Sequence, residues 1–499
     1  MRATLERRKQ SSSFAGARFC PALVMAALAR MKKKRSCERR TPPLFLSEGS
    51  VSEKKVSWLE LTLAVLVLGT CLAFALPKEA QARRLDRRSH VKFVPQFARR
   101  YNLKCSACHT IAPVLNEQGY LFKRLGYRLP PGLEEGKPAP TIAQLVAKEP
   151  KWALTNNAAL VVTDLSYSAE RSKQEGESAV STSSLQVASW NAYIGGWLPN
   201  TNFWYYSEAD IVSGGATNFD LSNAYFGYTG GNARSSWYVA GGREHLQIGT
   251  GTRAAQVYSL LPSAPLLFES AGPTNFVFDQ APVGIDVGYT FASSNYKHVL
   301  AATVKVMNGD NADGSEILGP SNRNSKDVWL DLDWWYAPES GVTLLGYYGT
   351  KDNAQTDSAG NAFTFSPHIR RQGIFANYKF FSKIDLLGGY LHNSDDWQVA
   401  EGGALGRYIG NDFYGAVDYY ITSDLAVSAR YDLLQHEITG PTGLGPQSTR
   451  NWGIGVSKTF TPLGNVIGRI AYGYLYGRDP IAAAKSTDRF FQADIGFNF

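Results

Sequence analysis

The sequence predicts an all-β transmembrane barrel of about 16 antiparallel strands that follows a small helical N-terminal domain. Three observations support this prediction. Runs of about ten residues alternate apolar and polar side chains, the connections between them alternate between short and long, and the chain ends on an aromatic strand. A soluble β-sandwich also shows alternating strands, so the connections and the final strand decide between the two folds.

The alternation is clearest at 327–336, where one face of the predicted strand is entirely apolar and the other includes Asp331 and Asp333 between Trp329 and Trp335. Segments 384–390 and 425–433 repeat the pattern. Apolar side chains that face lipid and polar side chains that face a lumen are expected from a membrane barrel. The lipid-facing residues of the first segment are Val328, Leu330, Leu332, Trp334 and Tyr336.

The connections have two lengths. Tight ones fall at 293–295, 338–340, 422–424 and 461–463, and long ones at 243–281, 308–326, 351–367, 394–407, 436–448 and 477–486. Short periplasmic turns opposite long external loops are typical of outer-membrane barrels, and an even strand number puts both barrel ends on the periplasmic side. The final strand places aromatic and aliphatic residues on one face: Phe491, Ala493, Ile495, Phe497 and Phe499.

The longest connection is itself apolar, and two outcomes are open for it: it folds inward and narrows the lumen, or it packs against a neighbour. A barrel of about 16 strands is wide enough to leave an aqueous interior. The apolar residues of this connection are Leu260, Leu261, Leu266, Leu267 and Phe268.

Residues 1–82 have the three parts of a secretory signal, in order: basic clusters, an apolar run from Leu61 to Leu76, and the small-x-small site at 80–82. A retained membrane anchor is the alternative, although the apolar run is shorter than the roughly 20 residues of a spanning helix. Met31 is a more natural start than Met1. We therefore exclude residues 1–82 from the fold as a removed leader.

Removing the leader changes the charge. It holds 15 of the 51 Lys and Arg residues and 6 of the 43 Asp and Glu residues, which leaves 36 basic and 37 acidic groups. The basic isoelectric point therefore belongs to the leader and gives no reason to expect nucleic-acid binding.

Only two cysteines follow the leader, in the sequence Cys105-Ser106-Ala107-Cys108-His109. This is the attachment pattern of a c-type haem. Two thiols three residues apart can form thioethers to one macrocycle, and the adjacent histidine supplies the proximal nitrogen to the iron. The sequence predicts one covalent haem c held by Cys105, Cys108 and His109. A redox-active disulfide and a zinc site remain as alternatives, but neither the flanking sequence nor the supply of nearby ligands favours them.

The sixth iron ligand is not visible in the sequence. Met307 is the only methionine after the leader and lies far away, and His90 is a weak distal candidate in a basic segment. An open position on the iron also remains, and it would suit ligand or peroxide chemistry.

Short helices are expected around the motif, one over 95–101 and one from Pro113 to about Leu125, before a Pro-Gly stretch at 130–140. We place the cytochrome domain at 83–145 and the barrel at 150–499. About 60 residues are too few for an independent core, so this domain should need the haem or the barrel wall, and it could plug the barrel. An apolar stripe on the second helix could cover the haem: Val114, Leu115, Tyr120, Leu121, Phe122 and Leu125.

The run from Phe97 to Thr110, continued by Pro113, Leu115, Asn116 and Gly119, resembles the head of the fused monohaem cytochrome–porins of iron-oxidising bacteria. The resemblance implies an outer-membrane protein in contact with lipid that takes electrons from extracellular Fe(II). It implies transfer through the haem to a periplasmic c-type cytochrome or copper protein. By the same analogy, Cys105 and Cys108 attach the haem and His109 is its proximal ligand.

Hard oxygen ligands suit ferrous and ferric ions, and the predicted lumen and loops offer several carboxylates, although most such groups are simply solvated. Two further functions stay open: a diffusion porin with a haem gate or sensor, and a haem peroxidase tethered to a barrel. The candidate iron contacts are Glu208, Asp210, Asp331, Asp333, Asp385, Asp412, Asp418 and Asp432 in the lumen, and Asp310, Asp313, Glu316, Asp395 and Asp396 in external loops.

Overall fold

The computed structural model describes residues 96–498 with gaps, of which the longest are 247–259, 262–277 and 309–325. The leader and His90 lie outside the described residues. All the described residues belong to one compact unit. No helix among them is long and apolar enough to cross a membrane.

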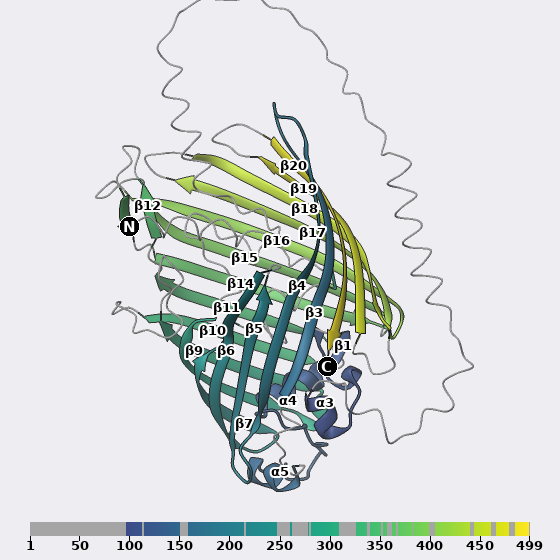
Figure 1. Ribbon diagram of the computed structural model, residues 1–499. Coiled ribbons are helices and arrows are strands. Elements are labelled where there is room, and N and C mark those ends of the chain that lie inside the picture. The colour runs from purple at the N-terminus through teal and green to yellow at the C-terminus, as the bar shows by residue number, and fades with distance from the viewer. Residues whose placement is uncertain are drawn as a thin grey trace, which may run out of the picture. The chain divides into compact units, whose positions relative to one another are not determined.

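Sixteen antiparallel strands of the described chain form a closed barrel (Figure 1). The first strand, β3, pairs with the last, β20, so the sheet has no open edge. This confirms the predicted all-β barrel and its strand number. The strands are β3 Ala158–Gln174, β4 Val180–Trp197, β5 Phe203–Ser213, β6 Ala216–Gly231, β7 Ser235–Arg243, β8 Val283–Ala292, β9 His298–Asn308, β10 Lys326–Tyr336, β11 Ser340–Thr350, β14 His368–Phe380, β15 Ile384–Gln398, β16 Leu405–Thr422, β17 Leu425–Thr439, β18 Leu444–Thr459, β19 Val466–Arg478 and β20 Lys485–Asn498.

The alternation sorts side chains between the two faces as expected. In β10, Asp331 and Asp333 are buried on the inner face, whereas Leu330 and Leu332 point outward and are 40% and 39% exposed. In β17, Arg430 and Asp432 are buried on the inner face, whereas Tyr431 between them points outward. The pattern follows from the period of two along a strand.

The connections alternate between the two ends of the barrel, but two of the long ones are shorter than expected. Strand β15 continues to Gln398 and β17 to Thr439, so their connections to the next strands are only 399–404 and 440–443. Asp395 and Asp396 therefore lie on β15, and their predicted position in an external loop was wrong. The strand continues because Asp395 pairs with Arg371 of β14, and Asp396 lies 2.8 Å from His368 at the start of the same strand. A separate hairpin, β12 (Asn353–Thr356) and β13 (Ala362–Phe365), lies in the connection after β11.

The N-terminal domain is built from short elements: α3 Gln96–Tyr101, a 3-10 turn at Cys105–Ala107, the two-stranded ladder of β1 His109–Ile111 and β2 Val114–Leu115, α4 Glu117–Arg124 and α5 Ile142–Lys148. The expected first helix is confirmed as α3. The second helix begins at Glu117, not at Pro113, because Val114–Leu115 pairs as a strand and the Asn116 side chain caps the helix. Helix α5, closed by a capping box at Thr141, was not foreseen.

Those residues between β7 and β8 that the structure describes include several that pack on the inner face of the barrel. Leu246 and Phe278 pack with inward residues of β9 and β10, such as Met307 and Trp329. Between them in sequence, Leu260 packs on Tyr420 and Ala426, while its carbonyl accepts a 2.7 Å hydrogen bond from Ser457 on β18. The cluster of Leu246 and Phe278 extends along the wall to Tyr414 and Ala416 of β16, the strand that also carries Tyr420, so these contacts follow one continuous side of the barrel. For Leu260 and Leu261 the inward alternative is confirmed; residues 266–268 lie outside the described residues.

Candidate functional site

The predicted haem-attachment residues share one tight turn. The Cys108 N–H donates to the Cys105 carbonyl at 3.1 Å, and the Ala107 N–H donates to the Lys104 carbonyl at 3.0 Å. Both cysteines are free and half-buried. His109 follows directly and pairs with Leu115 across the ladder of β1 and β2. The turn therefore brings two thiols and an imidazole-bearing residue together without a disulfide.

The thiols differ from those of a redox-active pair. Burial raises the pKa of the Cys105 thiol, and burial together with the neighbouring Cys105 raises the pKa of the Cys108 thiol to about 11. Catalytic Cys-x-x-Cys motifs instead depend on a lowered thiol pKa. Two protonated thiols beside a histidine are a donor set that fits covalent attachment of haem c.

Helix α4 holds this turn from one side. The Asn116 side chain donates to the carbonyls of Ser106 and Ala107 at 3.3 and 3.4 Å, and its own N–H donates to the Cys108 carbonyl at 3.0 Å. At Gly119 the turn comes closest, because a Cβ atom there would lie 2.2 Å from the Cys108 carbonyl oxygen. The start of α4 therefore sets the position of this turn, Cys105–His109 (the attachment turn).

One face of α4 docks on the inner wall of the barrel. The Tyr120 hydroxyl donates to the inward-facing Asp333 at 2.6 Å. The Arg124 guanidinium donates to Thr290 and Thr303 of β8 and β9 at 3.0 and 2.6 Å, and it also reaches two backbone carbonyls of the same strands. Residues at spacings of three and four share a helix face, and this face meets β8, β9 and β10.

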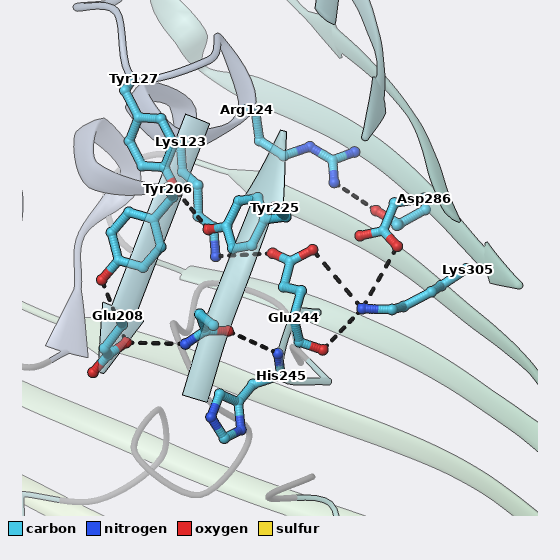
Figure 2. Close-up of polar contacts among 12 residues, drawn as sticks. Lys123, Arg124, Tyr127, Tyr206, Glu208, Tyr225, Glu244, His245, Asp286 and Lys305 are labelled. Atoms are coloured by element: carbon cyan, nitrogen blue, oxygen red, sulfur yellow. Dashed lines mark hydrogen bonds and ion pairs between the residues drawn. The ribbon is translucent and has the colours of Figure 1, made fainter. Parts of the chain in front are cut away.

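Figure 2 shows the polar network that surrounds Lys123. Its ammonium lies 3.7 Å from the Glu244 carboxylate, which is 3.9 Å from Lys305, and Lys305 lies 3.6 Å from Asp286. All four side chains are largely removed from solvent. The Lys305 ammonium also donates to the Glu244 carbonyl at 2.9 Å.

The shared charges set the protonation of Glu244. Burial alone would raise the pKa of its carboxyl, but the hydrogen bond with Asp286 and the charges of Lys305 and Lys123 bring that pKa below its ordinary value of 4.5. Burial lowers the pKa of Lys123, and Glu244 opposes this effect. Each group thus supports the charged form of the other.

A second network lies beside the first. The Tyr127 and Tyr225 hydroxyls are 2.5 Å apart, and the His245 N–H donates to the Asn223 side chain at 3.0 Å. Asn223 in turn donates to Glu208 at 2.9 Å (Figure 2). A small cavity remains between α4 and the wall, lined by residues from both networks.

The apolar side chains of the N-terminal domain pack against one another and against aromatic residues of the barrel wall. Tyr127 stacks with Phe97 and Tyr206 at centroid distances of 5.0 and 5.7 Å, and Arg100 lies 3.5 Å over the Trp197 ring. The predicted stripe of α4 divides in the same way. Phe122 joins this aromatic cluster, while Tyr120, Leu121 and Leu125 pack with α5 and the β8–β9 turn. These four side chains therefore attach the N-terminal domain to the barrel. Their covering of a haem face stays a prediction.

The predicted lumen carboxylates of the strands do face inward, but they are spread around the wall. The His436 Nε2 atom lies 2.8 Å from a carboxylate oxygen of Asp412. Asp385 of β15 lies directly opposite Asp418 of β16. Asp310, Asp313 and Glu316 lie outside the described residues. Within the described ranges no three His, Cys, Asp or Glu side chains are placed to hold a metal ion. Met307 is a buried core residue of the wall. An iron contact at any of these residues stays a prediction.

Sequence reasoning missed Lys123, Glu244 and Lys305. The available signal was the spacing of Tyr120, Lys123, Arg124 and Tyr127, which places polar groups at one helix face beside the apolar stripe. Nothing local in the sequence marks their partners: Glu244 lies more than a hundred residues after Lys123, and Lys305 lies 61 residues after Glu244.

No protein-family model and no curated protein matches the chain. Among solved structures, it is similar to outer-membrane OmpT of Vibrio cholerae, with 12% identity over 68% of this chain and 97% of that chain and a TM-score of 0.43. It is also similar to the outer-membrane channel DcaP of Acinetobacter baumannii, with 8% identity over 68% and 97% and a TM-score of 0.46. The anion-selective porin from Comamonas acidovorans gives 10% over 68% and 98%, with a TM-score of 0.45. Identities and scores this low carry no argument about function.

Proposed function

We propose that this chain is an outer-membrane electron-transfer protein, in which the barrel spans the membrane and the Cys105–His109 turn carries one covalent haem c. The observation that carries the proposal is the attachment turn itself, tied through Asn116 to a helix that docks inside a closed barrel. A passive channel has no use for a one-electron centre in this position.

Support for the membrane comes from the outer face of the barrel. Side chains such as Leu185, Ile285 and Ile454 are 72%, 59% and 53% exposed, and outward apolar residues recur on most of the strands. A patch of this extent is unfavourable in water and suits lipid. By the same rule the short turns face the periplasm, together with both barrel ends and the N-terminal domain.

Bound haem c would supply reversible one-electron chemistry. The residues of this chain would attach and orient it: Cys105 and Cys108 by their thiols, and His109 by its imidazole. Asn116 fixes the turn on α4, and Arg124 with Tyr120 fixes α4 on the wall. The turn would then lie between the lumen and the short-turn end of the barrel.

The direction of transfer follows from this placement and from the family resemblance. A soluble donor would reach the centre through the lumen, and extracellular Fe(II) is the donor that the resemblance implies. The acceptor would be a periplasmic c-type cytochrome or copper protein at the short-turn end. The hard carboxylates of the lumen suit passage of a ferrous ion.

The test uses the purified full-length protein in detergent. Covalent haem should be visible on a denaturing gel and should be lost from the Cys105→Ser, Cys108→Ser double variant. Anaerobic addition of Fe(II) should then convert the absorption spectrum promptly to that of reduced, low-spin haem. Absence of covalent haem would overturn the cofactor, and a haem that stays oxidised would overturn iron as the donor.

A diffusion porin is the second candidate, and one observation favours it. The barrel residues that contact the N-terminal domain come from β4 to β10, so the docked domain rests on one side of a ring of sixteen strands. An open polar passage along the other side would conduct ions. Planar-bilayer recordings decide between the two, because a sealed conduit should show no steady conductance.

A further inference from the structure

We propose that the outer surface of the seam between β3 and β20 binds the phosphate group of a membrane lipid of the outer leaflet, at the paired arginines Arg171 and Arg489. This goes beyond electron transfer and does not depend on a bound haem. Only the choice of leaflet rests on the orientation proposed for the barrel, with its long connections outside.

The first observation is a pair of like charges. Arg171 of β3 lies directly opposite Arg489 of β20, across the seam that closes the barrel. The Cβ atoms of such a pair are about 4.5–5.5 Å apart, and like charges at this spacing are destabilising. In the part of the chain that the structure describes, no ion pair or side-chain hydrogen bond involves either arginine. An anion bound between the two guanidinium groups would turn this repulsion into a bridge.

The second observation is that this face carries no opposing carboxylate. Both arginines are exposed, and on β3 Arg171 follows the outward residues Leu165 and Tyr167 at a period of two. The neighbouring Glu170 and Asp488 alternate with the arginines and so face the lumen. Strands β4, β18 and β19, on either side of the pair, have no acidic residue at all.

Two further cations and two hydroxyl groups lie along the next row of the wall. Exposed Lys173 is opposite Thr487, and exposed Arg450 is opposite Tyr476. Tyr476 and Thr487 are themselves paired, so the row runs across β3, β20, β19 and β18, which Figure 1 shows side by side. With strands about 4.8 Å apart and rows about 6.6 Å apart, one phosphorylated headgroup can reach all four cations.

The third observation places this patch at the membrane surface. The next outward residue of β20 toward the short turns is Phe491, and Tyr474 lies opposite Arg489. Tyr474 stacks on Trp452, which is 40% exposed, at a centroid distance of 6.2 Å. Aromatic girdles mark the interfaces of outer-membrane barrels, where the polar headgroups begin. Arginine binds a phosphate at that level through two parallel N–H donors.

Native mass spectrometry of the full-length protein, released from detergent micelles that contain phosphatidic acid, measures the binding. The parent protein should retain one phosphatidic acid. The Arg171→Gln, Arg489→Gln double variant should bind it about tenfold or more weakly, because charge-assisted hydrogen bonds are lost. Arg370→Gln is the matched control: this exposed outward arginine of β14 is paired with Tyr348 and Ser394, with no arginine opposite it.

Hydrogen exchange in lipid nanodiscs tests the bridge across the seam. In phosphatidylcholine alone, the β3 and β20 amides of the double variant should exchange no faster than those of the parent, because the change removes a repulsion. Adding phosphatidic acid should slow exchange at this seam several-fold in the parent protein. It should leave the double variant and the β7–β8 pair unchanged.

Equal binding of phosphatidic acid by the parent and the double variant, or an equal loss in Arg370→Gln, would overturn the seam as the site. The same slowing of exchange by inorganic phosphate in phosphatidylcholine would overturn a lipid as the occupant. Neither measurement uses haem or Fe(II), so failure here leaves the proposed electron transfer untouched.

Discussion

Glu117 stands in the first turn of α4, next to the residue that caps the helix and holds the attachment turn. Its Oε1 atom is buried without a hydrogen-bond partner, and burial raises the pKa of the carboxyl to about 7. A carboxyl at the start of a helix is usually stabilised as the anion by the helix dipole. Here desolvation outweighs that effect, so the folded domain favours the protonated form.

The pH dependence of α4 follows from this shift. Because the folded pKa lies above the ordinary value of 4.5, the contribution to stability is fully present below that value and is lost as the pH rises through about 7. Hydrogen exchange of the α4 amides, corrected for intrinsic rates, should therefore show stronger protection at about pH 5 than at about pH 8.

Glu117→Gln should reduce this difference in protection, whereas Glu135→Gln on the exposed linker should leave it intact. Glu149, whose pKa burial also raises to about 7, is present in all three proteins, so the comparison isolates Glu117. An unchanged pH profile in Glu117→Gln would assign the titration to another group.

At the scale of elements, α4 is the part that connects the attachment turn to the barrel. Its N-terminus binds the turn, its polar face binds β8 to β10, and its apolar residues join α3 and α5 to the wall. Eight residues would form only a marginal helix alone. The helix is stable because it is capped, docked and covered at once.

Gly119→Ala tests the fit between α4 and the turn. The added methyl group would meet the Cys108 carbonyl oxygen at 2.2 Å, so the turn has to move away from the helix. We expect covalent haem, measured by gel staining and by absorbance per protein, to fall several-fold. Gly132→Ala is the control, because nothing lies within 4 Å of the added atom there. Equal haem content in both variants would show that the close approach is not needed for attachment.

The parts of the fold that depend on local pattern were predictable, and the parts that depend on distant partners were not. Alternation within β10 was enough to place Asp331 and Asp333 inward, and the spacing of Cys105 and Cys108 was enough to place both in one turn. The ladder at Val114–Leu115 and the docking of Tyr120 on Asp333 were missed. The latter contact joins residues 213 positions apart, and a sequence carries no local trace of such a pairing.

For the whole molecule, the outward face predicts how the barrel tolerates charge. Leu332 lies near the middle of β10 and points outward, where an arginine at the bilayer midplane costs about 2–4 kcal/mol. Leu332→Arg should lower the yield of folded protein in lipid vesicles, measured by the fraction that resists protease. Phe381→Arg, at a turn where the side chain is 90% exposed, should leave the yield unchanged. Equal yields for both variants would mean that Leu332 does not face lipid.

The pairing of β3 with β20 also sets an order of assembly. The ring closes only when the first and last strands of the barrel meet, and that contact is the most distant in sequence of all its seams. The helices that dock inside precede β3 along the chain, so they are made before any wall exists to receive them. The N-terminal domain therefore has to stay beside the unpaired edge of β3 until β20 arrives. Otherwise it has to enter the finished barrel through the end that carries the short turns. A chain truncated before β20 would leave the N-terminal domain inside a barrel that cannot close.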